Sequence, residues 1–295
     1  MTRTAPTAAV PVPVVHLVGA GPGDPMLLTR RAARLLAAAD VVVLDRRSLD
    51  PIAALAPPAA ERIFVGRADV HPAWDTDAIA DLLADRARNG VHCAENHQKR
   101  GVLAQPIWPD QSSAQPTAVE CAENHQERAV FAQPIAADQR GPTPTVVRLK
   151  SGDPFVCSRG GEEMTALGAR GIHVEVTPGV SAATAAPLAA GLTRGRSVTI
   201  LAGNHDPLHP DTDVGALADP DSSLVVLVGR SRQAAIADAL VGSGLDPGTP
   251  AAVVHAATRA GARVVHTTVG ELGAHRLPPP ATVVIGPAEV HRAHP

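Results

Sequence analysis

The stretch LVGAGPGDPMLLT, residues 17–29, sets a turn of glycines and prolines between an apolar run and a helical pattern. A glycine-rich turn between a strand and a helix is typical of nucleotide-binding α/β proteins. The dinucleotide fingerprint requires a third glycine, and Asp24 occupies that position. Pro25 also removes a backbone N–H that a phosphate would use. The stretch therefore indicates a rigid turn that suits a neutral or cationic ligand at least as well as an anion, and a turn without any ligand is the alternative.

Short runs of Val, Ile and Leu alternate with helical patterns along the rest of the chain. Continuous apolar runs of this kind are typical of strands buried on both faces of a sheet. Thr29 is in the position of a helix N-cap. The alternation predicts two α/β domains, residues 12–177 and 178–291, with the active site in the cleft between them. The predicted strands are 14–18, 41–44, 62–65, 145–149, 173–176, 197–202, 224–228, 251–255, 263–269 and 282–285, and the predicted helices are 28–39, 161–170, 181–190 and 232–244.

One segment departs from this alternation. Residues 92–107, HCAENHQKRGVLAQPI, are repeated with small changes at 120–135, ECAENHQERAVFAQPI. Stable repeat architectures usually need about three units, and here there are two copies in a Gln-, Pro- and Ser-rich surrounding. We therefore predict that residues 91–143 form an inserted, poorly ordered segment in the first domain.

The cysteines raise the question of a metal. The repeat contains two Cys-x3-His pairs, formally a tetrahedral zinc ligand set, but their spacing differs from that of the usual zinc sites. Duplication alone produces two identical pairs, so we predict no metal. We predict that the third cysteine, Cys157, is a small packed residue. The two pairs are Cys93 with His97 and Cys121 with His125.

Composition excludes several classes of function. The 295 residues carry a net charge of −3 and only 2% aromatic residues, whereas a general nucleic-acid binder would show a basic surplus and stacking aromatics. No apolar run approaches the roughly 18 residues of a membrane span, and the proline-rich N-terminus is a poor signal peptide. The sequence therefore predicts a cytoplasmic protein with neither a nucleic-acid nor a membrane partner.

Two further turns accompany the first. A second Gly-Asp-Pro turn follows a predicted strand in VVRLKSGDPFVCSRGGEE, residues 146–163, and VEVTPGVSAATAAP, residues 174–187, contains a third turn of small residues. In this order, after residues 17–45, these motifs resemble the tetrapyrrole methylases, and most of all the members that act on uroporphyrinogen III. The resemblance covers about 12–90 and 144–290, and the set of three motifs is highly specific.

This resemblance implies a homodimeric, S-adenosylmethionine-dependent C-methyltransferase. The reaction would methylate uroporphyrinogen III at C2 and C7 to give precorrin-2, a precursor of sirohaem and cobalamin. A methyltransferase acting on a later corrin intermediate is one alternative, and a catalytically impaired homologue that still binds the cofactor is another. A nicotinamide-dependent reductase is disfavoured because the third glycine of its fingerprint is missing.

The resemblance also implies which residues bind the cofactor. They comprise a proline in the first loop, the second Gly-Asp-Pro turn, a helix start and two positions in the second domain. Three of them depart from the pattern of the family, because Ser151 and Ala257 replace glycines and Val228 replaces a methionine. The implied residues are Pro22, Ser151, Gly152, Asp153, Val156, Ser181, Ala182, Val228 and Ala257.

For catalysis, Asp45 matches the residue that accepts a proton in the family, and a merely solvated strand-end acid is the alternative. Arg67 stands where the family has a proton-donating lysine. An arginine stays protonated and is no ordinary acid, but it can bind a propionate. Because the substrate is an octacarboxylate, we expect Arg46, Arg159 and Arg194 to bind its carboxylates.

Overall fold

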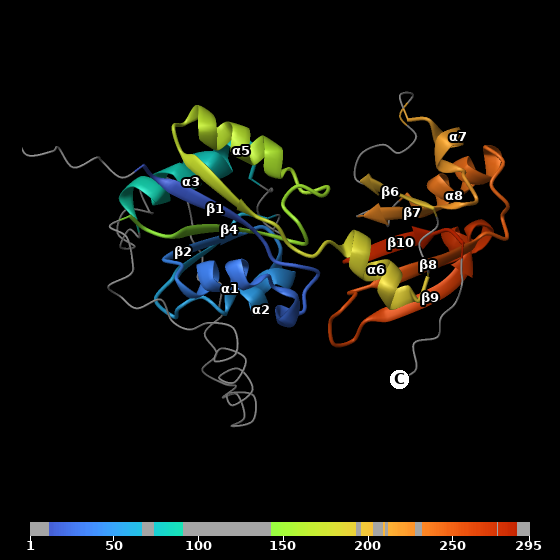
Figure 1. Ribbon diagram of the computed structural model, residues 1–295, viewed down its shortest axis with the longest axis horizontal. Coiled ribbons are helices and arrows are strands. Elements are labelled where there is room, and N and C mark those ends of the chain that lie inside the picture. Colours follow the sequence, from blue (N-terminus) through green and yellow to red (C-terminus); the bar gives the residue numbers. More distant parts are fainter. Residues whose placement is uncertain are drawn as a thin grey trace, which may run out of the picture. The chain divides into compact units, whose positions relative to one another are not determined.

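The computed structural model describes residues 12–66, 74–90, 143–192, 196–202, 209, 212–227, 232–275 and 277–287. These residues form two compact units, which Figure 1 colours along the sequence. The first comprises the described residues of Met1–Ala20, Leu28–Lys150 and Ser158–Gly179, and the second those of Gly21–Leu27, Ser151–Cys157 and Val180–Pro295. Both Gly-Asp-Pro turns thus belong to the second unit, although the chain sets them between elements of the first. The predicted insert and its two Cys-His pairs lie outside the described residues, apart from residue 143.

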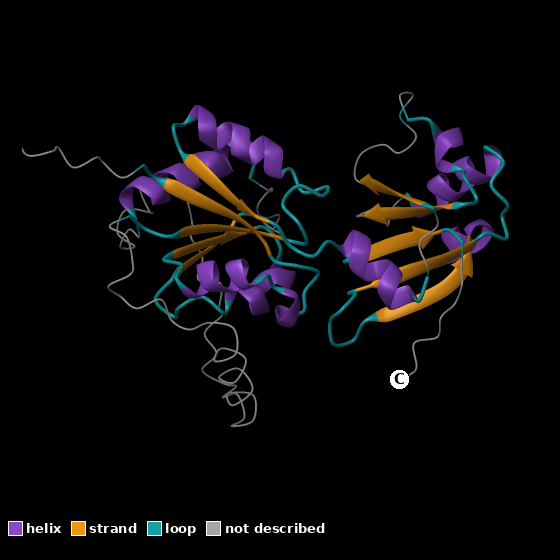
Figure 2. Ribbon diagram, viewed as in Figure 1, coloured by secondary structure: helices purple, strands orange, loops and turns teal. Residues whose placement is uncertain are grey.

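The first unit is a three-layer α/β structure. Its five-stranded parallel sheet has the order β3-β2-β4-β1-β5, with α3 and α5 on one face and α1 and α2 on the other (Figures 1 and 2). All five predicted strands are present, each within one residue of its predicted ends. The elements are β1 (Val14–Gly19), α1 (Arg30–Ala37), β2 (Val41–Leu44), η2 (Arg47–Leu49), α2 (Asp50–Ala53), β3 (Glu61–Phe64), α3 (Thr76–Asn89), β4 (Val146–Lys150), α5 (Gly160–Ala169) and β5 (His173–Thr177).

Strand β4 is buried along its whole length, yet it carries two cationic residues. Val147 and Leu149 belong to the apolar core under α1 and α2, whereas Val146 belongs to the core under α3 and α5. Successive side chains of a strand point to opposite faces. Arg148 and Lys150 therefore lie on the α3–α5 face with Val146, where a buried charge requires a partner.

The cap of α1 forms as predicted. Thr29 Oγ1 accepts a hydrogen bond from the backbone N–H of Ala32 over 3.2 Å, which satisfies one of the free N–H groups of the first turn. Because α1 begins only at Arg30, its positive end is set back from the glycines of the first loop.

The second unit contains a mixed sheet of order β6-β7-β10-β8-β9. Only β6 and β7 pair in parallel, and the other three pairs are antiparallel. Core residues alternate along the strands, so that α8 and η6 cover one face and α6 the other. All five predicted strands are present within two residues of their predicted ends. The elements are η1 (Pro25–Leu27), α6 (Ala182–Ala190), β6 (Ser197–Ala202), α7 (Val214–Leu217), β7 (Ser222–Leu227), α8 (Gln233–Gly242), β8 (Pro250–His255), β9 (Arg263–Thr268), η6 (Val269–Ala274) and β10 (Ala281–Ile285).

The length and composition of the helices bear on the predicted absence of a membrane span. Within the described parts of the chain, no helix combines the length and the apolar character needed to cross a bilayer.

Candidate active site

The two Gly-Asp-Pro turns are paired through their backbones. Gly21 donates to the carbonyl of Gly152 over 3.1 Å, and Gly152 donates back to Gly21 over 2.9 Å. Their φ angles are +70° and +68°, a left-handed conformation that favours glycine. The pairing holds together two loops that are far apart in the chain, since 131 positions separate residue 21 from residue 152.

Each turn is closed by its own aspartate. Asp24 Oδ1 accepts a hydrogen bond from the N–H of Met26 over 2.8 Å, and Asp153 Oδ1 accepts one from Phe155 over 2.8 Å. A short acidic side chain commonly stabilises a turn in this way. The residue that breaks the dinucleotide fingerprint is therefore one that shapes the loop.

The second turn lies against the start of α6. A Cβ on Gly152 would lie 3.7 Å from Cα of Ser181, so the two backbones are close neighbours. Ser181 caps α6, because its Oγ accepts a hydrogen bond from the N–H of Ala183 over 3.1 Å. Val156 and Ala182 pack on one small apolar cluster of this unit. The turn at 151–156 and the helix start at 181–182 thus lie side by side and pack on the same cluster.

Cys157 packs on the same cluster, as predicted. Burial raises the pKa of its thiol, which keeps the group protonated and unreactive at neutral pH.

A fourth segment of the second unit reaches the first loop. Arg259 donates from Nε to the carbonyl of Pro22 over 3.1 Å. Ala257, two residues earlier, is buried in the core beneath α6. Of the residues that the resemblance implies for cofactor binding, all but Val228 are described, and Val228 lies outside the described residues.

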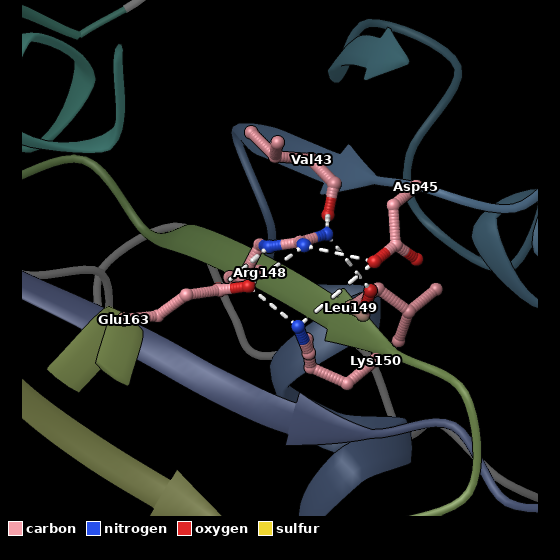
Figure 3. Close-up of polar contacts among 6 residues, drawn as sticks. All are labelled: Val43, Asp45, Arg148, Leu149, Lys150 and Glu163. Carbon is pink, nitrogen blue, oxygen red and sulfur yellow. Dashed lines mark hydrogen bonds and ion pairs between the residues drawn. The ribbon is translucent and has the colours of Figure 1, made fainter. Parts of the chain in front are cut away.

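A cluster of four buried or half-buried charges lies in the first unit, shown in Figure 3. Arg148 from β4 donates to Glu163 of α5 through Nε and Nη2, over 2.9 and 3.0 Å. Nη2 also donates to Asp45 Oδ2 over 3.1 Å. Lys150 Nζ lies 2.5 Å from Glu163 Oε1 and 3.9 Å from Asp45 Oδ2. Two cations therefore share two carboxylates, and the formal charges cancel.

The position of Asp45 follows from the sheet. Leu44, the last residue of β2, pairs with Leu149 of β4, so the residues that follow them, Asp45 and Lys150, lie at the same end of the sheet. Gly66, two residues after the end of β3, packs against Asp45, since a Cβ there would lie 2.1 Å from the carbonyl oxygen of Asp45.

The environment of Asp45 keeps it ionised. Burial raises the pKa of this carboxyl, but the charges of Arg148 and Lys150 and the hydrogen bond from Arg148 outweigh burial, so that the pKa falls below its ordinary value. The Asp45 side chain is 30% exposed, whereas that of Arg148 is 1% exposed. Oδ1 of Asp45 has no hydrogen-bond partner in the described part of the chain. The carboxylate is thus held through Oδ2, while Oδ1 is itself buried.

Burial and the neighbouring Arg148 also act on Lys150. Together they lower the pKa of its ammonium group, against the opposing effect of Glu163 and Asp45.

The structure describes only some of the arginines that were predicted to bind the substrate. Arg46 and Arg159 are exposed, and Arg46 is close enough to Asp45 to lower the pKa of that carboxyl further. Arg159 precedes α5 with a φ of +56°. Arg67 and Arg194 lie outside the described residues.

Sequence reasoning missed Arg148, Lys150 and Glu163. The signal is present in the run VVRLK, residues 146–150, which overlaps the predicted buried strand 145–149 and carries two cations at alternate positions. Such charges must be paired on one face of the sheet.

Comparison with known proteins identifies the family. The model of the Tetrapyrrole (Corrin/Porphyrin) Methylases matches residues 14–273. The chain belongs to the tetrapyrrole methylase family. The family and the two-domain α/β fold expected from the sequence are thus confirmed.

Curated relatives of this tetrapyrrole methylase include siroheme synthases. That of Chromobacterium violaceum is 33% identical over 281 residues, which cover 92% of this chain and 48% of the relative. That of Nitrosospira multiformis is 32% identical over 288 residues, covering 94% and 50%. The chain therefore spans about half the length of the curated relatives that it matches.

Solved structures give a match over nearly the whole length. Uroporphyrin III C-methyltransferase from Thermus thermophilus in its native form has a TM-score of 0.61 and 32% identity, with 92% of each chain covered. The complex of that protein with S-adenosyl homocysteine has a TM-score of 0.59 and 31% identity, covering 92% of this chain and 91% of the other.

The described residues contain no group of three or more His, Cys, Asp or Glu side chains that could hold a metal ion.

Proposed function

We propose that this tetrapyrrole methylase transfers methyl groups from S-adenosylmethionine to C2 and C7 of uroporphyrinogen III and so forms precorrin-2, for sirohaem or cobalamin. The observation that carries the proposal is that Asp45 is a partly exposed carboxylate with a lowered pKa, held in place by Arg148. The names of the Thermus thermophilus structures and of the siroheme synthases support this choice of substrate.

The residues of the second unit fit a methyl donor with an amino-acid end. The hydroxyl of Ser181 and the first N–H groups of α6 can bind a carboxylate. Gly152, with its positive φ and its close approach to Ser181, leaves the turn open to a ligand beside the backbone. S-adenosylmethionine supplies an electrophilic methyl group when it is bound. We propose that Pro22, Ser151, Gly152, Asp153, Val156, Ser181, Ala182, Val228 and Ala257 hold it.

Asp45 would act on the acceptor. An electron-rich pyrrole carbon becomes cationic when it gains a methyl group, and the ring system must then lose a proton. Loss of a proton from a cation requires only a weak base, so a carboxylate with a lowered pKa suffices. Arg148 and Lys150 hold Asp45 ionised, and Glu163 balances their charge. Because the substrate carries eight carboxylates, we propose that Arg46, Arg67, Arg159 and Arg194 bind some of them.

We further propose a cytoplasmic homodimer. Two large apolar side chains of the second unit support the dimer: Leu188 on α6 is 81% exposed and Ile200 on β6 is 42% exposed. Light scattering coupled to size-exclusion chromatography should give twice the mass of the chain, and a monomer at micromolar concentration would contradict the dimer.

Anaerobic incubation with uroporphyrinogen III and S-adenosylmethionine, followed by mass spectrometry, tests the reaction. Two added methyl groups are expected. Cofactor binding without methyl transfer to uroporphyrinogen III would overturn the proposed reaction and leave a later corrin substrate or an impaired homologue. Absence of cofactor binding would exclude all of these.

A further inference from the structure

Arg259 is a half-buried arginine whose guanidinium has one hydrogen-bond partner among the residues that the structure describes. Its Nε donates to the carbonyl of Pro22, and neither Nη1 nor Nη2 has a hydrogen-bond partner or a carboxylate in the described ranges. Two other arginines with buried guanidinium groups are fully matched, since Arg148 pairs with Glu163 and Asp45, and Arg86 pairs with Glu61 and Asp85. Arg259 therefore keeps four N–H donors for a group that the described chain does not supply.

The first loop is shaped to receive this side chain. A Cβ on Gly23 would lie 1.7 Å from Nε of Arg259, so the arginine side chain crosses the loop directly over Gly23. The φ of Gly23, +136°, is a conformation that residues other than glycine rarely adopt. The Arg259 side chain therefore lies directly against the backbone of the first loop at Pro22 and Gly23.

The segment that carries Arg259 is held in an unusual backbone conformation. Ala256 and Thr258 have φ values of +49° and +70°, although neither is a glycine. The N–H of Ala256 donates to Pro280, and that of Arg259 donates to Ala256, each over 3.0 Å. Thr258 Oγ1 is buried without a hydrogen-bond partner in the described residues. Strain of this kind persists where a structure fixes a side chain for a function.

The guanidinium of Arg259 indicates which kind of group it binds. Burial lowers the pKa of Arg259, because a desolvated cation without a counter-ion is costly, yet an arginine stays charged at neutral pH. Its planar fork matches the two oxygens of a carboxylate. Both substrates of the proposed reaction carry carboxylates, the tetrapyrrole on its acetate and propionate groups and the methyl donor on its amino-acid end.

We propose that Arg259 is the receptor for a carboxylate of one of these two substrates, an inference that rests on the proposed function. Pro22 fixes the Nε side of the guanidinium, and the Nη groups bind the two carboxylate oxygens. The same contact ties the first loop to the 256–259 segment when the ligand is bound.

The test compares Arg259→Gln and Arg259→Lys with Arg263→Gln, which removes an exposed arginine of the same unit. Calorimetry measures the binding of S-adenosylhomocysteine and of its decarboxylated analogue, and initial rates give the KM for uroporphyrinogen III. Circular dichroism shows whether each variant is folded. The lysine variant keeps a positive charge but lacks the planar guanidinium, so it reports on carboxylate binding if the glutamine variant is unstable.

Two results support the proposal and identify the source of the carboxylate. If the carboxylate is that of the methyl donor, Arg259→Gln weakens the binding of S-adenosylhomocysteine about tenfold or more. The affinity for the decarboxylated analogue then stays unchanged. If the tetrapyrrole supplies it, both nucleosides bind as before and the KM for uroporphyrinogen III rises about tenfold or more. Arg259→Lys gives a smaller loss in the same parameter.

Other results overturn it. An equal loss of affinity for S-adenosylhomocysteine and for its decarboxylated analogue would show that Arg259 only holds the loop in place. Changes in affinity and KM no larger than those of Arg263→Gln would show that Arg259 has no role in binding. If the unmodified protein binds S-adenosylhomocysteine but the variants are unaffected, only this inference falls. If the unmodified protein does not bind it, the proposed function falls as well.

Discussion

Arg148 holds Asp45 through one oxygen, with Nη2 donating to Oδ2 over 3.1 Å. Glu163 makes two hydrogen bonds to the same guanidinium, so the arginine is divided between a structural partner and a candidate base. The hydrogen bond to Asp45 orients a carboxylate whose side chain is 30% exposed, and a fixed orientation is what proton removal by a side chain requires.

Asp45→Asn should lower kcat about 100-fold or more and leave the affinity for S-adenosylhomocysteine within about twofold, because the amide keeps the shape but cannot accept the proton. Methyl transfer to uroporphyrinogen III and calorimetry measure the two quantities. Asp238→Asn changes an exposed aspartate of α8 and is the matched control. An equal loss of turnover and affinity would refute the role of Asp45 as the base.

Glu163→Gln should destabilise the fold, because it leaves Arg148 and Lys150 buried with one carboxylate between them. Breaking a buried pair by removing one partner costs about 3 kcal/mol or more, or about 6 °C in the midpoint of thermal unfolding. Glu162, the preceding residue of α5, is exposed, and Glu162→Gln should change the midpoint by about 1 °C or less. Equal midpoints for the two variants would show that the cluster contributes nothing to stability.

The pH dependence of stability should carry the signature of Asp45. Its pKa in the folded protein is below the value of a free aspartate, so the unfolded chain binds more protons in acid. The contribution of Asp45 to the free energy of unfolding is therefore complete above about pH 4 and is lost as the pH falls through the lowered pKa. Thermal unfolding of the unmodified protein and of Asp45→Asn at a series of acid pH values should show midpoints that converge as the pH falls. A constant difference between about pH 3 and 7 would contradict the lowered pKa.

The sequence predicts the strands and the paired turns well, because apolar runs and Gly-Asp-Pro motifs are local signals. It does not predict that β8, β9 and β10 run antiparallel, since an apolar run carries no direction. Nor do local patterns show which distant residues neutralise Arg148 and Lys150. Glu163 is assigned to a helix start from its neighbours in the chain, and only the packing of α5 on the sheet shows that it is a counter-ion.

The predicted insert should be dispensable for the fold. Gly90 ends α3, and a Cβ on it would lie 3.9 Å from Cβ of Pro144, so the two ends of the segment are already adjacent. Replacing residues 91–143 by a linker of a few glycines and serines joins them without strain and removes residues that make no predicted contribution to the core. Soluble yield and the unfolding midpoint should stay within a few degrees of those of the full chain. A collapse of soluble yield, with a longer linker failing to restore it, would show that the duplicated segment is structural.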